Sequence, residues 1–183
     1  MELQTERLLL RPWHESDAEA LYEYAKDQRV GPIAGWPVHA SVENSREIIR
    51  NVLTAPEIYA VVLKQNGRPV GSIGLMIGSQ SNIGLPDNEC EVGYWIGVPY
   101  WGQGLIPEAV RELQRHAFDD LEMQKIWCGY FDGNVKSKRV QEKCGFRYQF
   151  TKENVSSQLV GEFRTEHITC QTKEEWMMDK SVI

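Results

Sequence analysis

Two glycines separated by one residue stand before a helix-like apolar pattern in the segment YWGQGLIPEAV, residues 100–110. Glycine in a regular element loses more conformational entropy than other residues, so Gly102 and Gly104 indicate a backbone shape that other residues adopt poorly. The turn follows an apolar stretch at 89–98 that alternates as a strand does, and a 3.6-residue repeat predicts a helix over about 107–119. The chain must therefore fold with a strand, a sharp turn and a helix in direct succession.

The same turn allows two interpretations. It is either a tight connection, or a cradle in which the amides of Gln103, Gly104, Leu105 and Ile106 bind an anion such as a pyrophosphate. Pro107 has no N–H and suits the first helical position. The common nucleotide fingerprints do not match, because GxxxxGK[ST] is absent and Pro107 stands where GxGxxG needs its third glycine.

Composition narrows the class of protein. A length of 183 residues predicts one domain, 1–183, and a net charge of −6 argues against a nucleic-acid coat and favours cationic small partners. We expect a cytoplasmic protein without membrane or nucleic-acid partners, because no apolar run approaches the roughly 20 residues of a membrane span and no signal peptide is seen. The histidines lack ligand spacing, so we expect no metal, and we place His116 on a helix surface. Four widely spaced cysteines are expected to be reduced thiols: Cys90, Cys128, Cys144 and Cys170.

Periodicity and turn residues predict the element order strand, two helices, three strands, helix, strand, helix, two strands. This order indicates a mixed α/β or α+β fold. Polar loops are expected at 28–40, 79–88 and 152–164. Asn66-Gly67 predicts a hairpin turn, and Thr172 with Glu175 predicts a capping box for a terminal turn ending near Trp176. The strands are expected at 7–13, 57–64, 68–77, 89–98, 125–131, 147–151 and 166–172, and the helices at 16–27, 41–55, 107–119 and 134–145.

Two pairs of polar residues are candidates for chemistry. Asn134 and Ser137 lie three residues apart at a helix start; Asn134 suits an N-cap, whereas propensity does not explain Ser137. Residues 136–143 add the cations Lys136, Lys138, Arg139 and Lys143, which form either a solvated face or a phosphate contact. Glu89 and Glu91 share one face of the strand before the glycine turn. They are either candidates for a general base or part of a solvated sheet edge.

Four segments together, TERLLLRPW, EVGYWIGVPYWGQGLIPEAV, GNVKSKRVQEKCGF and TKEEW, resemble the GNAT N-acetyltransferase superfamily. The similarity is greatest to the ribosomal-protein N-terminal (serine/alanine) acetyltransferases, and it covers nearly the whole chain in order. The resemblance implies a single twisted mixed sheet of about seven strands with about four helices, and two splayed strands between which acetyl-CoA binds.

The resemblance also implies roles for individual residues. The turn at Gln103, Gly104, Leu105 and Ile106 would bind the pyrophosphate of acetyl-CoA. Trp101 and Ile106 depart from the family pattern, but the main-chain N–H groups that would bind the pyrophosphate do not depend on these side chains. An amide near Ile96 to Val98 would polarise the thioester carbonyl, and Asn134 and Ser137 would lie at the cofactor, with Ser137 near the sulfur. Lys136 and Arg139 are the candidate contacts of the 3′-phosphate.

We therefore predict an acetyl-CoA-dependent N-acetyltransferase in which a primary amine attacks the thioester directly in a ternary complex. Ser137 would assist the leaving thiolate, and Glu91, with Glu89 behind it, would act as base. The acceptor is predicted to be a protein N-terminal α-amine. The alternatives are a small-molecule amine such as a polyamine or an antibiotic, and a non-catalytic acyl-CoA-binding sensor. The three polar loops are the expected substrate walls, and a homodimer is compatible with the sequence.

Overall fold

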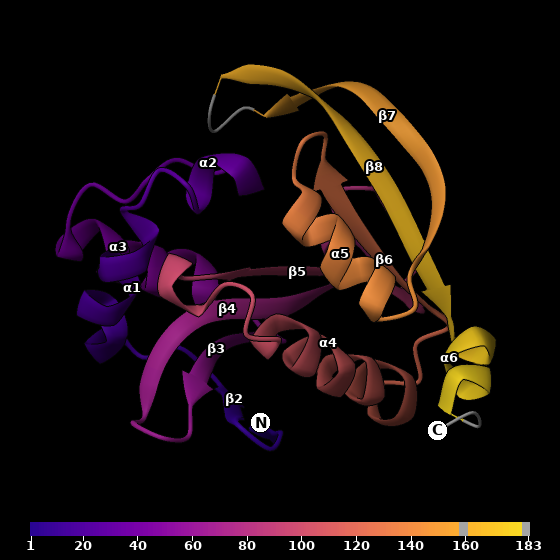
Figure 1. Cartoon of the computed structure of the whole chain (residues 1–183), viewed down its shortest axis with the longest axis horizontal. Helices are drawn as coiled ribbons and strands as arrows, with labels where there is room; N and C mark the ends of the chain where they lie inside the picture. The colour runs from indigo at the N-terminus through magenta and orange to yellow at the C-terminus, as the bar shows by residue number, and fades with distance from the viewer. Residues whose placement is uncertain (158–160, 181–183) are drawn as a thin grey trace.

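A computed structural model describes residues 1–157 and 161–180 of the chain, and within them eight strands form one mixed sheet (Figure 1). The strand order is β1-β2-β3-β4-β5-β6-β8-β7, and all neighbours are antiparallel except the parallel pair β5 and β6. The strands are β1 Leu3–Gln4, β2 Leu8–Arg11, β3 Ile58–Leu63, β4 Arg68–Ile77, β5 Glu89–Ile96, β6 Lys125–Phe131, β7 Arg147–Ser157 and β8 Glu162–Thr172.

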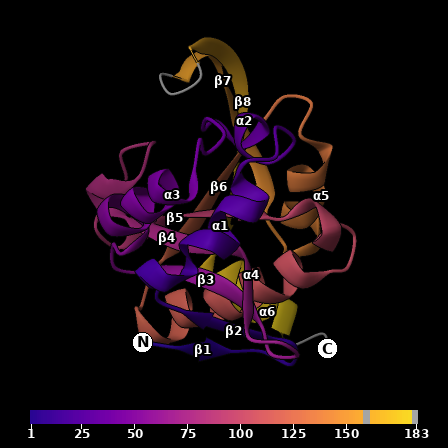
Figure 2. The same ribbon diagram turned by 90° about the vertical axis from the view of Figure 1, so that its left-hand side faces the viewer.

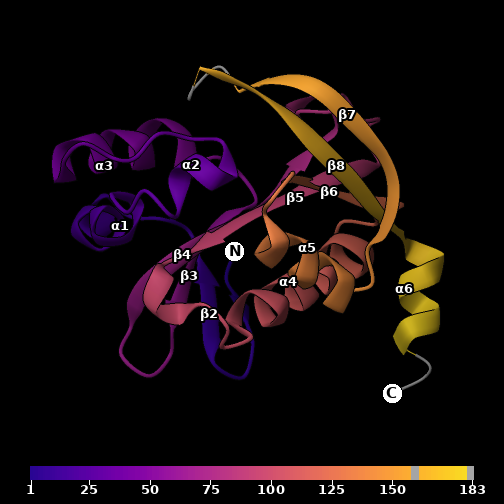
Figure 3. The same cartoon turned by 45° about the horizontal axis from the view of Figure 1, so that its top comes forward.

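Helices cover both faces of the sheet. Figure 3 shows α1, α2 and α3 grouped on one side of β4 and β5, with α4 and α5 on the other; Figure 2 looks onto the side of α1 to α3. The α-helices are α1 Ala18–Ala25, α2 Gly31–Ala34, α3 Val42–Ile48, α4 Leu105–Arg115, α5 Val135–Lys143 and α6 Lys173–Lys180. Wider π-helical turns extend α3 over Ile49–Leu53 and α4 over His116–Asp120.

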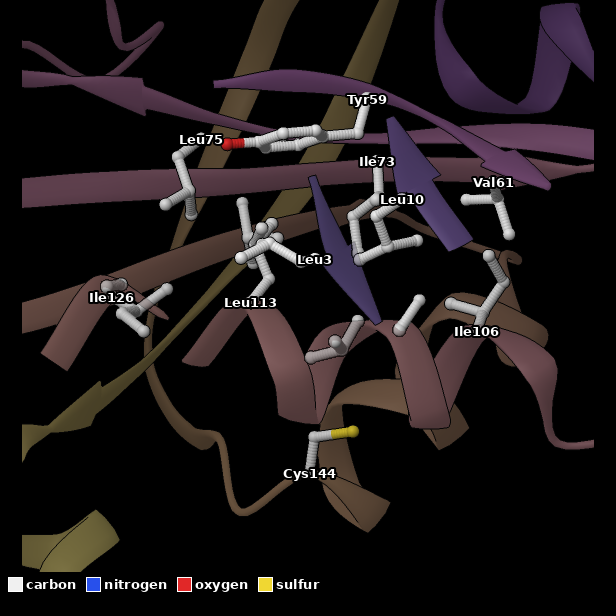
Figure 4. Close-up of a cluster of buried hydrophobic side chains, with 14 of the residues drawn as sticks. Leu3, Leu10, Tyr59, Val61, Ile73, Leu75, Ile106, Leu113, Ile126 and Cys144 are labelled. Carbon is white, nitrogen blue, oxygen red and sulfur yellow. The ribbon is translucent and has the colours of Figure 1, made fainter. Parts of the chain in front are cut away.

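Two apolar cores lie on the two faces of the sheet. The larger core packs Ile106 and Leu113 of α4 against Leu10, Ile73 and Leu75 of the strands (Figure 4). A smaller core joins α1 and α3 to the other face. Side chains of β5 alternate between these layers, so the strand carries different chemistry on each face.

The turn and the caps agree with the sequence pattern, with one correction. Gly104 is the N-cap of α4, and Glu108 N donates to its carbonyl at 3.2 Å, so the helix begins at Leu105. Pro107 is therefore the third helical residue and not the first. The missing N–H still removes no helical hydrogen bond, because amides in the first turn have no partner within the helix.

The predicted fold class is confirmed: one mixed sheet of eight strands, with six α-helices among the described residues, is close to the expected seven strands and four helices. Three other expectations were wrong in detail. The predicted loop at 28–40 contains α2, and the predicted loop at 152–164 is largely strand, because β7 and β8 pair from Arg147↔Cys170 to Ser157↔Glu162. His116 is fully buried and not on the helix surface. All four cysteines are free thiols, as expected.

One feature of the sheet positions the site. β5 and β6 pair only from Glu89↔Lys125 to Glu91↔Trp127, although β5 continues to Ile96 and β6 to Phe131. The two strands then run apart, and α5 lies in front of β6 in Figure 1. This is the splayed pair that the resemblance implied, with the glycine turn beyond the free end of β5.

Candidate active site

The shape of the glycine turn depends on two residues with left-handed backbone angles. Gly102 and Gly104 have left-handed φ values of +75° and +76°. A Cβ at Gly102 would meet nothing within 4 Å, and one at Gly104 would meet only Arg7 Nη2 at 3.7 Å. Arg7 Nη1 donates to the Gln103 carbonyl at 3.0 Å, and Gln103 Nε2 donates to the Pro99 carbonyl at 2.8 Å. Conformation, and not lack of room, therefore requires glycine at both positions.

The start of α4 presents backbone donors. The amides of Gly104, Leu105 and Ile106 come before the first helical hydrogen bond, at the positive end of the helix dipole. Glu108 anchors this end of the helix to the N-terminal segment, since its carboxylate pairs with Arg7 at 2.6 Å. These amides have the arrangement that an anion such as a pyrophosphate requires.

A cation lies beside the turn. Lys136 Nζ is 4.1 Å from the ring centroid of Trp101, whose indole N–H donates to the Ile96 carbonyl at 3.0 Å. Trp101, where the family pattern has Gln or Arg, therefore brings a lysine of α5 to the turn through its ring face. The guanidinium of Arg139 makes no such contact among the described residues, although it lies on the same helix.

The free end of β5 directs backbone groups into the opening between the strands. Gly97 N donates to the Val70 carbonyl of β4 at 2.8 Å. Since N–H groups alternate in direction along a strand, the Ile96 N–H points away from β4 and towards β6. Val98 lies after the strand, in the 3₁₀ turn Val98–Tyr100. Of the two predicted amides, Ile96 is the one that the register aims into the opening.

The start of α5 brings Asn134 and Ser137 together. Asn134 Oδ1 accepts from Ser137 N at 3.2 Å, which confirms Asn134 as the N-cap. Ser137 Oγ lies 3.0 Å from the hydroxyl of Tyr94 on β5. Burial raises the pKa of Tyr94 well above its ordinary value, so the phenol stays protonated. Ser137 thus lies on the α5 side of the sheet, at the level where β5 and β6 have separated.

Both candidate bases are buried, which excludes the solvated sheet edge. Glu89 is 9% exposed and both its oxygens are engaged, one with Trp127 Nε1 at 2.6 Å and one with Lys125 Nζ at 3.0 Å. Glu91 is 6% exposed, and its Oε2 accepts from Ser81 Oγ at 2.7 Å and from Asn82 N at 2.9 Å. Among the residues that the structure describes, Glu91 Oε1 has no hydrogen-bond partner, whereas both oxygens of Glu89 are engaged.

Glu166 is a third carboxylate on this face, and the sequence analysis missed it. Its side chain covers Gly129, where an added Cβ would come within 2.4 Å of Glu166 Oε1. Burial raises the pKa of Glu166, and the charge of Glu91 raises it further. No local pattern marks this residue; only the register Phe131↔Glu166 of β6 and β8 brings it beside the opening.

A cavity of about 700 Å³ opens beside Trp101 of the glycine turn and Lys136 of α5. It brings two of the three predicted substrate walls, 28–40 and 152–164, together with the glycine turn and α5. The third segment, 79–88, holds Glu91 instead, and neither Glu91 nor Ser137 lines the cavity. The lining residues are Gln28, Arg29, Pro32, Ile33, Trp101, Phe131, Asp132, Lys136, Arg164 and Thr165.

This geometry agrees with the comparisons to known proteins. Residues 7–147 match the family described as Acetyltransferase (GNAT) domain. The chain belongs to the GNAT acetyltransferase family. Among its relatives, the "Putative ribosomal N-acetyltransferase YdaF" of Bacillus subtilis is 31% identical over 147 residues, which cover 77% of this chain and 78% of the relative. The aminoglycoside N(6′)-acetyltransferase type 1 of Klebsiella pneumoniae is 26% identical over 78% of this chain and 75% of its own length.

A solved structure shows the same fold. The GNAT acetyltransferase of Bacillus anthracis superimposes with a TM-score of 0.83 at 24% identity, covering 95% of this chain and 99% of that one. This GNAT protein is thus an N-acetyltransferase that uses acetyl-CoA as co-substrate. Three features of the site fit that co-substrate: the amides at the start of α4, Lys136 beside the glycine turn, and the separated strands β5 and β6. No helix among the described residues has the length and apolarity to cross a bilayer.

Proposed function

We propose that this N-acetyltransferase acetylates the α-amine of a protein N-terminus. The observation that carries the proposal is the charge around the cavity. Two cations that the proposed cofactor contacts do not use, Arg29 and Arg164, line it against the single carboxylate of Asp132; Lys136 also lines it, but is assigned to the cofactor. A polyamine or an aminoglycoside, with several positive charges, would be repelled by this lining, whereas a peptide N-terminus brings one. The name of the Bacillus subtilis relative, which refers to ribosomal N-acetylation, supports the same class of acceptor.

The cationic side chains are held in place. Arg164 is 20% exposed; it lies over the Phe131 ring at 5.3 Å and pairs with Glu162 at 2.7 Å. Arg29 pairs with Asp27 at 2.6 Å. Neither acidic partner is among the residues that line the cavity, so each ion pair presents its guanidinium to the cavity. An acceptor peptide with acidic residues after its N-terminus would complement this surface.

The proposed mechanism uses three groups around the separated strands: the Ile96 amide, Ser137 of α5, and Glu91 at the last paired position of β5. The acceptor amine attacks the thioester, the Ile96 amide stabilises the oxyanion, and Ser137 donates to the departing thiolate. Glu91 accepts the amine proton through Oε1, directly or through water. The turn amides and Lys136 hold the phosphates of acetyl-CoA.

An α-amine suits a base of this kind. With a pKa of about 7.7–8.0, an α-amine loses its proton at pH 7 at a cost of about 1 kcal/mol, whereas a lysine amine needs roughly 4.6 kcal/mol. One oxygen of Glu91 already accepts two hydrogen bonds. Deprotonating an α-amine costs less than deprotonating a lysine amine, so it requires less of the remaining oxygen.

The test is a comparison of acceptors. Initial rates of CoA release are measured with peptides that have neutral, acidic or basic residues after a free N-terminus, with the same peptides N-terminally blocked, and with spermidine and kanamycin. We expect kcat/KM to be highest for acidic peptides and to be lost when the N-terminus is blocked. Faster turnover of spermidine or kanamycin would overturn the proposal and favour a small-molecule acceptor. No turnover with any amine would favour the acyl-CoA sensor.

A further inference from the structure

Helix α5 carries one almost fully buried polar side chain. Gln141 is 1% exposed and lies one helical turn after Ser137, on the same helix face. Its Nε2 donates to the Gly129 carbonyl and to Ser137 Oγ, each at 3.1 Å, and its Oε1 accepts from Thr169 Oγ1 at 2.8 Å. The Gly129 carbonyl fixes the direction of this amide, because the flipped amide would place two oxygens opposite each other.

The resulting network joins the two separated strands. Tyr94 on β5 and Gly129 on β6 both lie beyond the last pair of these strands, Glu91↔Trp127. Tyr94 contacts Ser137, Ser137 contacts Gln141, and Gln141 contacts the Gly129 carbonyl. The position of the Ser137 hydroxyl is therefore set from both sides of the opening.

The network also determines where the Ser137 proton can point. A serine hydroxyl has one proton and two lone pairs. Gln141 Nε2 can only donate, so it occupies one lone pair. The Tyr94 phenol, protonated, lies 3.0 Å from Ser137 Oγ and 3.2 Å from the Ser137 carbonyl, so its one proton has these two acceptors. When that proton goes to Oγ, both lone pairs are occupied and the serine proton is left for a third partner.

We propose that Gln141 is a positioning residue, which fixes the Ser137 hydroxyl so that its proton is presented to the leaving sulfur of acetyl-CoA. This inference rests on the proposed role of Ser137 in the transfer reaction. Gln141 touches neither substrate and acts only through Ser137. The chemistry of the side chain is specific: a glutamate would offer no N–H to Gly129 or Ser137, and a methionine would fill the space without a donor.

A double-mutant cycle tests the inference. The enzyme, Ser137→Ala, Gln141→Met and the double variant are compared for kcat, for KM of acetyl-CoA and for thermal unfolding, with whichever amine in the panel gives the highest turnover. We expect Gln141→Met to lower kcat about tenfold, with KM for acetyl-CoA changed less than about twofold. In the Ser137→Ala background the same change should alter kcat less than about twofold.

Thr169→Val supplies a second variant in case Gln141→Met does not fold. It retains Gln141 and removes the hydroxyl that holds Oε1, so we expect a smaller loss of kcat, about threefold, that again disappears in the Ser137→Ala background. Equal losses in both backgrounds would overturn the positioning role and make Gln141 purely structural. An unchanged kcat in Ser137→Ala alone would instead contradict the proposed role of Ser137. A small amine as the preferred acceptor would contradict only the N-terminal acceptor.

Discussion

The left-handed backbone of Gly104 offers a sharp test of the turn. Its φ is +76° and its ψ is +8°, yet a Cβ there would make only an ordinary contact, 3.7 Å from Arg7 Nη2. The penalty for Gly104→Ala is therefore conformational, about 1–2 kcal/mol for an L-residue in this region. Valine should be worse, because its β-branch restricts the backbone and χ1 further. A chain of this size loses about 2–4 °C in Tm per kcal/mol.

Relief of that strain would move the donors. If the turn rotates to give residue 104 a negative φ, the amides of Leu105 and Ile106 no longer point at one ligand position. We expect Gly104→Val to raise the Kd of acetyl-CoA at least about tenfold, which is about 1.4 kcal/mol. Isothermal titration calorimetry measures the affinity, and urea unfolding measures the stability.

Gly67 provides the matched control. It has φ +68° in the β3–β4 hairpin, and an added Cβ would meet nothing within 4 Å. Gly67→Ala and Gly67→Val should therefore lose as much stability as the same changes at Gly104 while binding acetyl-CoA like the unchanged protein. An unchanged Kd in Gly104→Val would refute the assignment of the turn. So would an equal loss of affinity in Gly67→Val, because the effect would then follow stability alone.

Three further predictions concern charge and protonation. Lys136→Met should weaken CoA binding and reduce its salt dependence, and desphospho-CoA should be less affected if Lys136 meets the 3′-phosphate; calorimetry at two salt concentrations decides this. Glu91→Gln should lose most activity near pH 7 and recover partly at high pH, where free amine is plentiful, whereas Glu89→Gln should lose activity evenly; a pH-independent ratio for Glu91→Gln would contradict its role as base. Burial lowers the pKa of His39 to about 4, so the folded state binds fewer protons than the unfolded state between about pH 6.5 and 4, and stability should fall by at most about 3 kcal/mol as pH drops through that window. Urea unfolding of His39→Gln, with the exposed His14→Gln as control, should show the dependence removed only in the former.

Local signals were enough for the turn and the caps. The left-handed backbone angles at positions 102 and 104 require glycine. Short hydrophobic repeats predict the strand before these residues and the helix after them. The cap at Asn134 and the capping box between Thr172 and Glu175 are confirmed at 2.9–3.2 Å, because a cap depends on residues three positions apart. Such features need no knowledge of distant segments.

His116 shows where local reasoning ends. The helix widens into a π-helical turn over His116–Asp120, which changes the face on which a residue lies relative to a 3.6-residue period. His116 then lies fully buried between Asp120, at 2.8 Å, and Glu57, at 2.9 Å and 59 positions away. The sequence contains no sign of that partner, so a surface position was the natural expectation.

The net charge of the chain does not describe the charge around the cavity. A charge of −6 favours cationic partners in bulk, but the cavity gathers Arg29, Lys136 and Arg164 from three distant parts of the chain. Arg164 reaches it because β7 and β8 extend through a segment whose polar composition is typical of a loop. Pairing between the two strands satisfies the backbone there, and sequence composition does not report that pairing.

In the proposed mechanism, β5 organises the groups that act on the reactants. Side chains of successive residues alternate between faces, so Glu91 and Tyr94, three positions apart, point to opposite sides of the sheet. Backbone groups lie in the plane of the sheet, and the Ile96 N–H points into the opening because β6 has turned away. A strand beside a diverging neighbour therefore offers groups in three directions along one stretch of chain, here between Glu91 and Ile96. In our proposal the amine arrives on the face of Glu91 and Glu166, the oxyanion forms in the plane, and the thiolate departs on the face of Ser137. A neighbour that stayed paired to the end of β5 would take the Ile96 amide for its own ladder, and the reaction would lose the donor between its two sides.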